Sequence, residues 1–227
     1  MFKLSVDETP LTEEELLHRK VAVATVRGRP YYNITCALRL MKLQFDSLSP
    51  EEAAVSNAKV IITTQDEAGT VNTKGIVIID TELEKYPAIA KAKILRSIMG
   101  ERAIDDQLII GIDPGSRIGI SAIYLHHEIA SAVVESSLQD AINQVAAMLG
   151  GIESRKKVVK IGDGNITMAS QIALMLKMKF KDGISIEIVD EHGTSLPQNT
   201  GANRRGARDR SSARTIAFRS GRSFTLK

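Results

Sequence analysis

The sequence lacks tryptophan, has a single cysteine and contains only 4% aromatic residues among its 227 positions. So few aromatic side chains argue against an extensive surface for stacking nucleic-acid bases. The lone Cys36 can form neither an intrachain disulfide nor a cysteine-based zinc cluster, and we expect it to be a small buried apolar residue. No apolar run approaches the ~20 residues that a membrane-spanning helix needs.

The N-terminus also lacks the layout of a secretory signal, because residues 1–20 are acidic and are interrupted by Pro10. We therefore expect a cytoplasmic protein. Its 43% hydrophobic and 25% charged residues are ordinary for a globular chain, and its length allows two small domains.

Charge separates the two halves of the chain. Residues 1–106 carry 14 Lys and Arg against 16 Asp and Glu, whereas residues 107–227 carry 16 against 11. The last 30 residues hold eight of these cations and a single acid, Asp209. Because the planar guanidinium group suits phosphate, this basic tail predicts a nucleic-acid partner; a merely solvated tail is the alternative.

Hydrophobic patterning in the first half predicts a small α/β domain over residues 1–105. Its sequence contains no metal cluster, phosphate loop or nucleophile–base signature. The segments RGRP and Thr63–Thr64 follow strands, where ligands often bind in α/β sheets, but a docking module is an equally good interpretation. The expected elements are strands at 21–26, 59–64 and 75–80, helices at 31–45, from Pro50 and at 87–100, and a turn at 27–30.

The second half, residues 106–227, has a different order of expected elements: three strands come first, and helices then alternate with strands. We expect strands at 108–113, 118–125, 128–134, 157–162 and 184–190, and helices at 138–149, 167–180 and 208–220. This βββαβαβα order is the plan of a ribonuclease-H-like domain, a mixed α/β sheet flanked by helices.

Several motifs in this half resemble one family of nucleases. IGIDPGSRIGI (110–120) resembles the opening motif of RuvC-type and YqgF-type nucleases, which include Holliday junction resolvases. IVDEHGTS (188–195) resembles the acidic strand end of the YqgF branch. With IGDGN (161–165), it is also similar to the YqgF-like domain of the transcription-associated Tex proteins. DRSSARTIA (209–217) is similar to the family's last helix. The resemblance does not reach the N-terminal domain.

The resemblance implies a magnesium or manganese site built from carboxylates. In the family, the aspartate at the end of the first strand binds the metal, and the matching residue here is Asp113. Other matching positions add Glu191 and Asp209, and Asp163 is a fourth candidate ligand. Clustered carboxylate oxygens are the ligands that magnesium prefers. Two ions about 4 Å apart can hold the attacking water and the leaving oxygen of a phosphodiester.

Asp113 and Asp163 each have a simpler structural interpretation. Asp113 follows a buried apolar strand, a costly place for a carboxylate unless a cation or strong donors compensate it, yet it could cap the Pro-Gly turn instead. The motif is also shared with sugar kinases and actin-like ATPases, which use a similar phosphate loop. Asp163 lies in Asp-Gly-Asn, which is ordinary turn chemistry, so ligand and turn residue are equally good interpretations.

The two later acids carry their own alternatives. Glu191 is the preferred ligand over Asp190, although a register shift of one residue would exchange them. On a helix, Asp209 shares a face with Ala213, Ile216 and Ala217, which must pack inward, but it could also be an N-terminal capping acid. Ser212 stands where RuvC-like enzymes often carry a second aspartate, so the sequence predicts a site with fewer carboxylate ligands.

These features give a leading functional hypothesis and two competitors. The leading one is a magnesium-dependent endonuclease, resolvase-like, which acts on structured DNA or another structured nucleic acid and could be a homodimer. The second is a nucleic-acid-binding or scaffold protein that has lost the chemistry. The third, an actin-like ATPase, fails mainly on length, because that architecture needs two ribonuclease-H-like lobes and only one can be read in this sequence. The arginines expected to position the phosphate backbone are Arg204, Arg205, Arg208, Arg210 and Arg214.

Overall fold

The computed structural model of the chain describes residues 20–71, 73–99, 106–192 and 204–225, and the side chains of 204 and 205 lie outside that description. The chain divides into two compact units, Met1–Gly100 and Glu101–Lys227. In the ranges that the structure describes, no helix is both long and apolar enough to cross a membrane.

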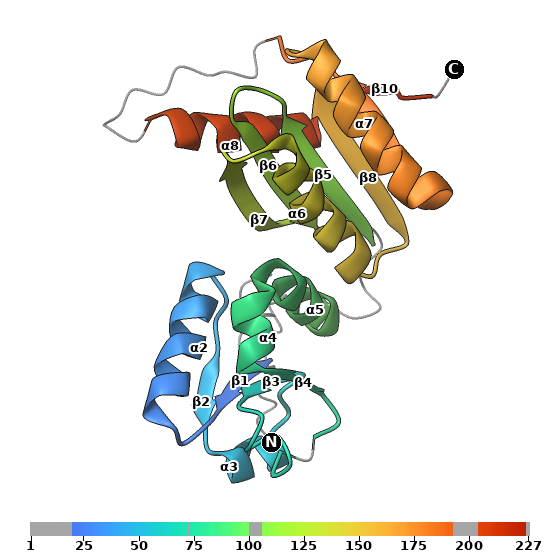
Figure 1. Cartoon of the computed structure of the whole chain (residues 1–227). Helices are drawn as coiled ribbons and strands as arrows, with labels where there is room; N and C mark the ends of the chain where they lie inside the picture. The colour runs from blue at the N-terminus through green and yellow to red at the C-terminus, as the bar shows by residue number, and fades with distance from the viewer. Residues whose placement is uncertain (1–19, 72, 100–105, 193–203, 226–227) are drawn as a thin grey trace, which may run out of the picture. The chain divides into compact units, whose positions relative to one another are not determined.

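The first unit is built on a four-stranded parallel sheet in the order β2-β1-β3-β4 (Figure 1). The order reverses between β1 and β3, which makes this pair the topological switch point of an α/β sheet. The strands are β1 (Val21–Ala24), β2 (Asp46–Leu48), β3 (Val60–Thr63) and β4 (Ile76–Ile79). The helices are α2 (Gly28–Leu40), α3 (Pro50–Val55), α4 (Asp80–Lys85) and α5 (Pro87–Met99).

Helix α2 begins and ends earlier than the sequence predicted, so the expected turn at 27–30 and the expected helix end at 45 are wrong. Pro30 lies in the first turn, where its missing N–H costs no hydrogen bond. Lys42 adopts a positive φ of 56°, and the Leu43 N–H donates back to the Leu38 carbonyl. That geometry ends the helix without a glycine.

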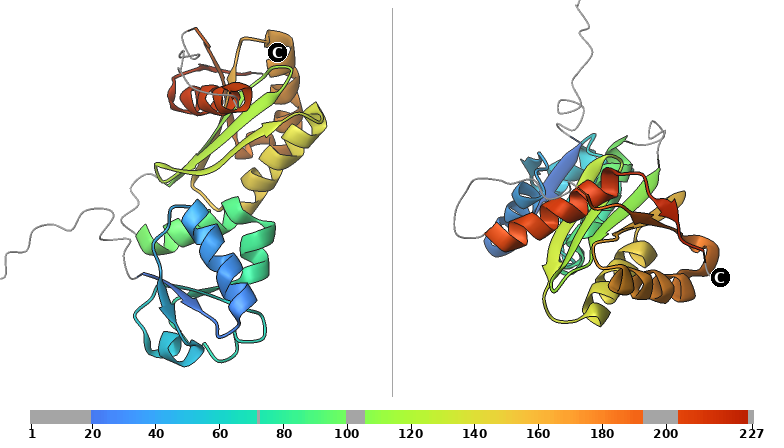
Figure 2. Two further views of the ribbon diagram at one scale, coloured as in Figure 1. Left: turned by 90° about the vertical axis from the view of Figure 1, so that its left-hand side faces the viewer. Right: turned by 90° about the horizontal axis from the view of Figure 1, so that it is seen from above.

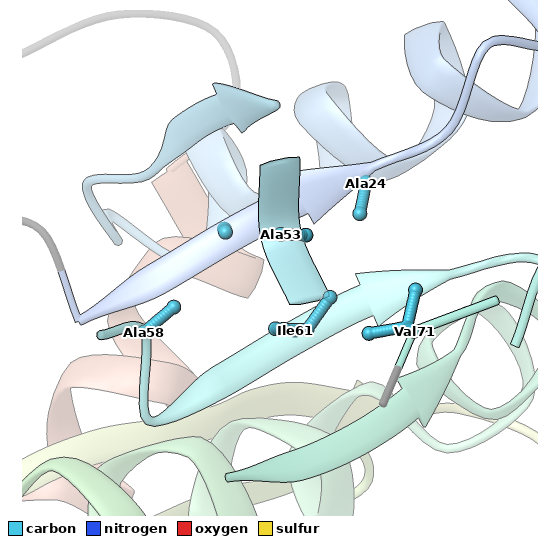
Figure 3. Close-up of a cluster of buried hydrophobic side chains, with 6 residues drawn as sticks. Ala24, Ala53, Ala58, Ile61 and Val71 are labelled. Carbon is cyan, nitrogen blue, oxygen red and sulfur yellow. The ribbon is translucent and has the colours of Figure 1, made fainter. Parts of the chain in front are cut away.

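The core of the first unit is closed on one side by small residues. Ala53 of α3 lies buried against Ala24 of β1, Ile61 of β3 and Val71 of the following loop (Figure 3). Helix α3 starts where the sequence predicted, because Ser49 and Glu52 form a reciprocal capping box. Cys36, expected to be buried, is half-buried on α2.

The second unit has a six-stranded mixed sheet in the order β10-β9-β8-β5-β6-β7 (Figure 1). Its first three strands are antiparallel neighbours, and β8 and β9 extend the sheet in parallel on the other side of β5. This is the ribonuclease-H plan. The elements are β5 (Gln107–Asp113), β6 (Ile118–Tyr124), β7 (His127–Val134), α6 (Leu138–Gly151), β8 (Lys156–Gly162), α7 (Ile166–Phe180), η2 (Lys181–Gly183), β9 (Ser185–Val189), α8 (Arg204–Phe218) and β10 (Arg222–Ser223).

Most of these elements confirm the sequence prediction, and the exceptions have physical causes. The strands β2 and β10 have only three and two residues, too few to show a period. Helix α4 is six residues long and follows β4 directly. Helix α8 starts four residues before the predicted 208, because Gly206 is tolerated inside it. Residues 193–203, between β9 and α8, lie outside the described residues.

Helix α8 covers one face of this sheet, and α6 and α7 cover the other (Figure 2). Its inward stripe of Ala213, Ile216 and Ala217 is fully buried, as the sequence predicted. A Cβ placed on Gly111 of β5 would collide with the Ala213 carbonyl oxygen and lie 2.8 Å from the Ala217 nitrogen. The helix backbone therefore rests directly on β5, an approach that only glycine permits.

We predict that Gly111→Ala destabilises the second unit by about 2–3 kcal/mol, because the added methyl group meets helix backbone rather than a movable side chain. The matched control is Gly150→Ala. Gly150 lies inside α6, where an added Cβ would meet nothing within 4 Å, so this change should stabilise by about 0.5–1 kcal/mol. Urea unfolding followed by circular dichroism measures both. Equal effects of the two substitutions would contradict the close helix–sheet contact.

Candidate carboxylate site at the edge of the second sheet

Asp113 is the last residue of β5 and is half-buried. Burial first, and then the negative charges of Glu191 and Asp209, raise its pKa from 3.8 to about 6. A hydrogen bond from Ser212 and the positive charge of Arg208 act in the opposite direction. Three acids from three separate elements therefore lie within electrostatic reach of one another.

Asp209 reaches this edge from α8. A Cβ on Gly119 of β6 would collide with the Asp209 carbonyl oxygen and lie 3.3 Å from the Cβ of Asp113. Gly119 pairs directly with Asp113 across the antiparallel ladder. The absence of a side chain at Gly119 thus lets α8 bring Asp209 beside Asp113. Because α8 begins at Arg204, Asp209 lies in the second turn, so the capping interpretation is wrong.

Glu191 approaches from the end of β9. Its carboxylate lies against the Cα atoms of Gly162 and Gly164, where any Cβ would collide with a carboxylate oxygen. Burial raises the pKa of Glu191, a hydrogen bond from the backbone of Gly164 lowers it, and the charge of Asp163 raises it again, with a net rise. The two glycines therefore form a cradle shaped for this side chain.

The backbone around Glu191 is held on both sides. Asp163 accepts a hydrogen bond from the Glu191 N–H at 3.1 Å. Arg219, just after α8, donates to the carbonyl oxygens of Asp190 at 3.0 Å and His192 at 2.7 Å. The backbone that carries Glu191 is therefore held by side chains from two different segments of the chain.

Asp163 and Asp190 have different positions from Glu191. The structure gives Asp163 a positioning contact with the Glu191 backbone, which matches its interpretation as a turn residue and leaves its role as a ligand a prediction. Asp190 is 74% exposed, and its carboxylate contacts the His192 ring at 3.2 Å. Hydrogen bonds from the backbone and the ring of His192 lower the pKa of Asp190. Of the two neighbouring acids, Glu191 is the one beside Asp113.

The acidic side chains at this edge are chemically suited to bind a divalent cation, but the distances between them are not. Carboxylate oxygens suit magnesium or manganese, and a nearby cation would relieve the cost of the buried charge at Asp113. Glycines at 119, 162 and 164 give the acids room to approach. Yet among the described residues no three His, Cys, Asp or Glu side chains are close enough to hold one metal ion. The acids are gathered at one edge but not closed around one point.

Two contributors to this site were missed by the sequence interpretation. Ser212 is 5% exposed and hydrogen bonds to Asp113, although the sequence pointed only to the missing second aspartate there. Arg117 forms an ion pair with Asp209, with 2.6 Å between Nη2 and Oδ2. Its position in the motif, four residues after Asp113, was the available signal, because a turn of that length returns the chain beside its start.

The structure describes the side chains of three of the five predicted phosphate-binding arginines. Arg208, Arg210 and Arg214 are exposed on α8, and Arg208 is near enough to lower the pKa of Asp113. Arg204 and Arg205 belong to the first turn of α8, but their side chains lie outside the described residues. The acids and part of the basic helix therefore lie at one edge of the sheet.

Polar residues gather at the switch point of the first unit, at the strand ends where the sequence places RGRP and Thr63–Thr64. The Glu67 carboxylate accepts from the Val26 N–H at 3.0 Å and from the Thr64 hydroxyl at 2.7 Å. Burial alone would raise the pKa of Glu67, but hydrogen bonds from Thr25, Thr64 and Val26, with the charge of Arg27, hold it below its ordinary value. These donors are satisfied within the unit, so we assign no ligand to them.

A cavity of about 670 Å³ also lies in the first unit, at the N-terminal ends of β3 and β4. Lys59 and Lys74 line it together with small polar residues, and both lysines are exposed. It contains none of the carboxylates described above. Since its walls show no arrangement of acid, base or nucleophile among the described residues, the carboxylate edge is the better candidate for chemistry.

Comparisons with known proteins leave the family open. No family model and no curated protein matches the chain. Among solved structures, the crystal structure of Aa-Ago with externally bound siRNA is similar at 10% sequence identity and a TM-score of 0.27. The similarity covers 77% of this chain and 35% of that one, so the chain spans about a third of its length. At that TM-score the likeness carries no argument, and the fold assignment rests on the strand order.

We predict that Asp113→Asn stabilises the metal-free protein at pH 7.5 and not at pH 4. The pKa of about 6 in the folded state lies above the ordinary 3.8, so the folded protein keeps a proton that the unfolded chain releases between these values. The stability contributed by that proton is lost as the pH rises through this window. The cost above pH 6 is about 1–2 kcal/mol, less than the ~3 kcal/mol of the full shift, because solvent screens a half-buried group.

Thermal unfolding in EDTA at the two pH values measures this effect. Asp182→Asn is the control for loss of one acid, because Asp182 is fully exposed on η2 and should change the melting temperature little at either pH. A melting temperature of Asp113→Asn that differs from wild type equally at pH 4 and pH 7.5 would contradict the proposed environment of Asp113.

Proposed function

We propose that this protein is a metal-dependent nuclease, an endonuclease of the resolvase-like kind, which hydrolyses phosphodiester bonds in structured nucleic acid. The acting residues would be Asp113, Glu191 and Asp209. The observation that carries the proposal is the meeting of these three acids at one sheet edge, where burial and their mutual repulsion raise the pKa of Asp113. Such a costly concentration of negative charge is typical of sites that hold cations or move protons.

Each acid would have its own part in binding the metal. Asp113 is presented by the central strand, Asp209 by the helix above the sheet and Glu191 by the end of a strand on the parallel side of the sheet. Magnesium or manganese held there would neutralise the charge that develops when water displaces an oxygen at phosphorus. Asp163 would keep the Glu191 backbone in place, and we retain it as the candidate fourth ligand.

The nucleic acid would approach along the exposed face of α8. Arg208, Arg210 and Arg214 are exposed there and would contact the phosphate backbone without reading sequence. Arg208 is near enough to Asp113 to lower its pKa and would place a phosphate beside the acids. DNA as the preferred substrate, and a homodimer matching the two-fold symmetry of a four-way junction, remain predictions.

We predict that the full chain cleaves at least one of four substrates in MgCl₂: a four-way junction, a flap, a nicked duplex or an RNA–DNA hybrid. Asp113→Asn should lower the cleavage rate by about 100-fold or more, because it removes a charge from the metal ligands. EDTA should abolish cleavage. Asp182→Asn is the matched control and should cleave like wild type, because Asp182 is fully exposed at the opposite end of β9 from Glu191.

A second candidate function is a nucleic-acid-binding protein without nuclease activity. It is favoured by two observations: the described acids do not close around one metal position, and Arg117 already pairs with Asp209. Binding to the same four substrates, without cleavage and without any rise in melting temperature on adding magnesium, would support this function. Equal cleavage by wild type and Asp113→Asn would rule out the nuclease site proposed above.

A further inference from the structure

Arg117 bridges two acids at the carboxylate edge. It lies in the turn just before β6, and its guanidinium contacts Asp209 Oδ2 through Nη2 at 2.6 Å and Glu135 Oε1 through Nη1 at 3.1 Å. Glu135 follows the end of β7. The same cation is therefore shared between an acid of the candidate site and an acid at its rim.

The two partners of Arg117 differ in their exposure to water. The side chain of Asp209 is 22% exposed, that of Arg117 27%, and that of Glu135 67%. An ion pair is stronger where solvent is partly excluded, so the contact with Asp209 is the stronger of the two. The contact with Glu135 is a surface pair and holds the guanidinium loosely.

The atom that Arg117 contacts is one that a metal ion would need. Asp209 Oδ2 is buried, and it is the oxygen on which the guanidinium rests. A divalent cation bound to that oxygen would face the positive charge of Arg117 at close range. The two cations therefore compete for the same carboxylate oxygen, and the repulsion between them at that distance weakens the binding of the metal.

We infer that Arg117 is the resident counter-ion of the carboxylate site, which a divalent cation must displace from Asp209 before it can bind. This inference rests on the proposed metal-dependent function and deepens it. In the metal-free protein, Arg117 neutralises Asp209. When a metal binds, the guanidinium stays on Glu135 at the rim. Arg117 thereby sets the metal affinity of the site.

The test measures metal binding rather than cleavage. Manganese binding to the full chain is followed by isothermal titration calorimetry, and the rise in melting temperature with magnesium gives a second readout. Arg117→Gln should bind manganese about tenfold more tightly than wild type, because a positive charge near a divalent ion is removed. Its melting temperature should be lower without metal and should rise about twice as far when magnesium is added.

Two further variants separate charge from packing. Arg117→Lys keeps the charge and should bind manganese within about threefold of wild type. Arg155→Gln makes the same change just before β8, where Arg155 is 80% exposed, and should leave manganese binding unchanged. A folding defect in Arg117→Gln would show in its circular dichroism. Arg117→Met, which also removes the charge but keeps a long side chain, then takes its place with the same expected tightening, and unchanged binding by a folded Arg117→Met would overturn the inference.

The outcomes distinguish the inference from the proposed function. Tighter binding by Arg117→Gln supports the inference, including the case in which wild type itself binds too weakly to measure. Wild-type binding that is unchanged or weakened in Arg117→Gln overturns the inference and leaves the metal-dependent function standing. No binding by any variant overturns both.

Discussion

Helix α8 lies directly on the backbone of β5 and β6, and the carboxylate site depends on that contact. Side chains at Gly111 and Gly119 would collide with the backbone of α8, so these positions set how near the helix can come to the sheet. The buried stripe of α8 holds it there, and Asp209 is thereby placed beside Asp113. The same device recurs at Gly162 and Gly164, which admit Glu191. Glycines on the sheet and just beyond it thus allow acids that are distant in sequence to lie close together.

The arrangement concentrates negative charge where water is partly excluded, which costs stability in the metal-free protein. Burial raises the pKa values of Asp113 and Glu191, and the charges of neighbouring acids raise them further: Glu191 and Asp209 for Asp113, and Asp163 for Glu191. The chain offsets this cost with its own groups. Ser212 hydrogen bonds to Asp113, and Arg117 neutralises Asp209. A destabilising cluster of charges that the surrounding fold holds together is typical of functional sites.

Much of the second unit could be predicted from sequence, because its elements are long and periodic. The order of strands and helices and the inward face of α8 both follow from hydrophobic spacing. The place of Asp209 in the helix did not, since Gly206 concealed the true start of α8. The motif did signal that Arg117 returns beside Asp113, but neither its ion pair with Asp209 nor the hydrogen bond of Ser212 could be predicted. Both depend on how closely α8 approaches the sheet, a tertiary distance that no local pattern contains.

A crystal structure of the protein soaked with manganese tests the central claim most directly, because anomalous scattering locates the ion independently of the protein atoms. We predict one or two ions about 2.2 Å from carboxylate oxygens of Asp113, Glu191 and Asp209, with Arg117 displaced from Asp209 and resting on Glu135. A structure without manganese at this edge, in which the three acids remain apart and Arg117 still contacts Asp209, would contradict the claim.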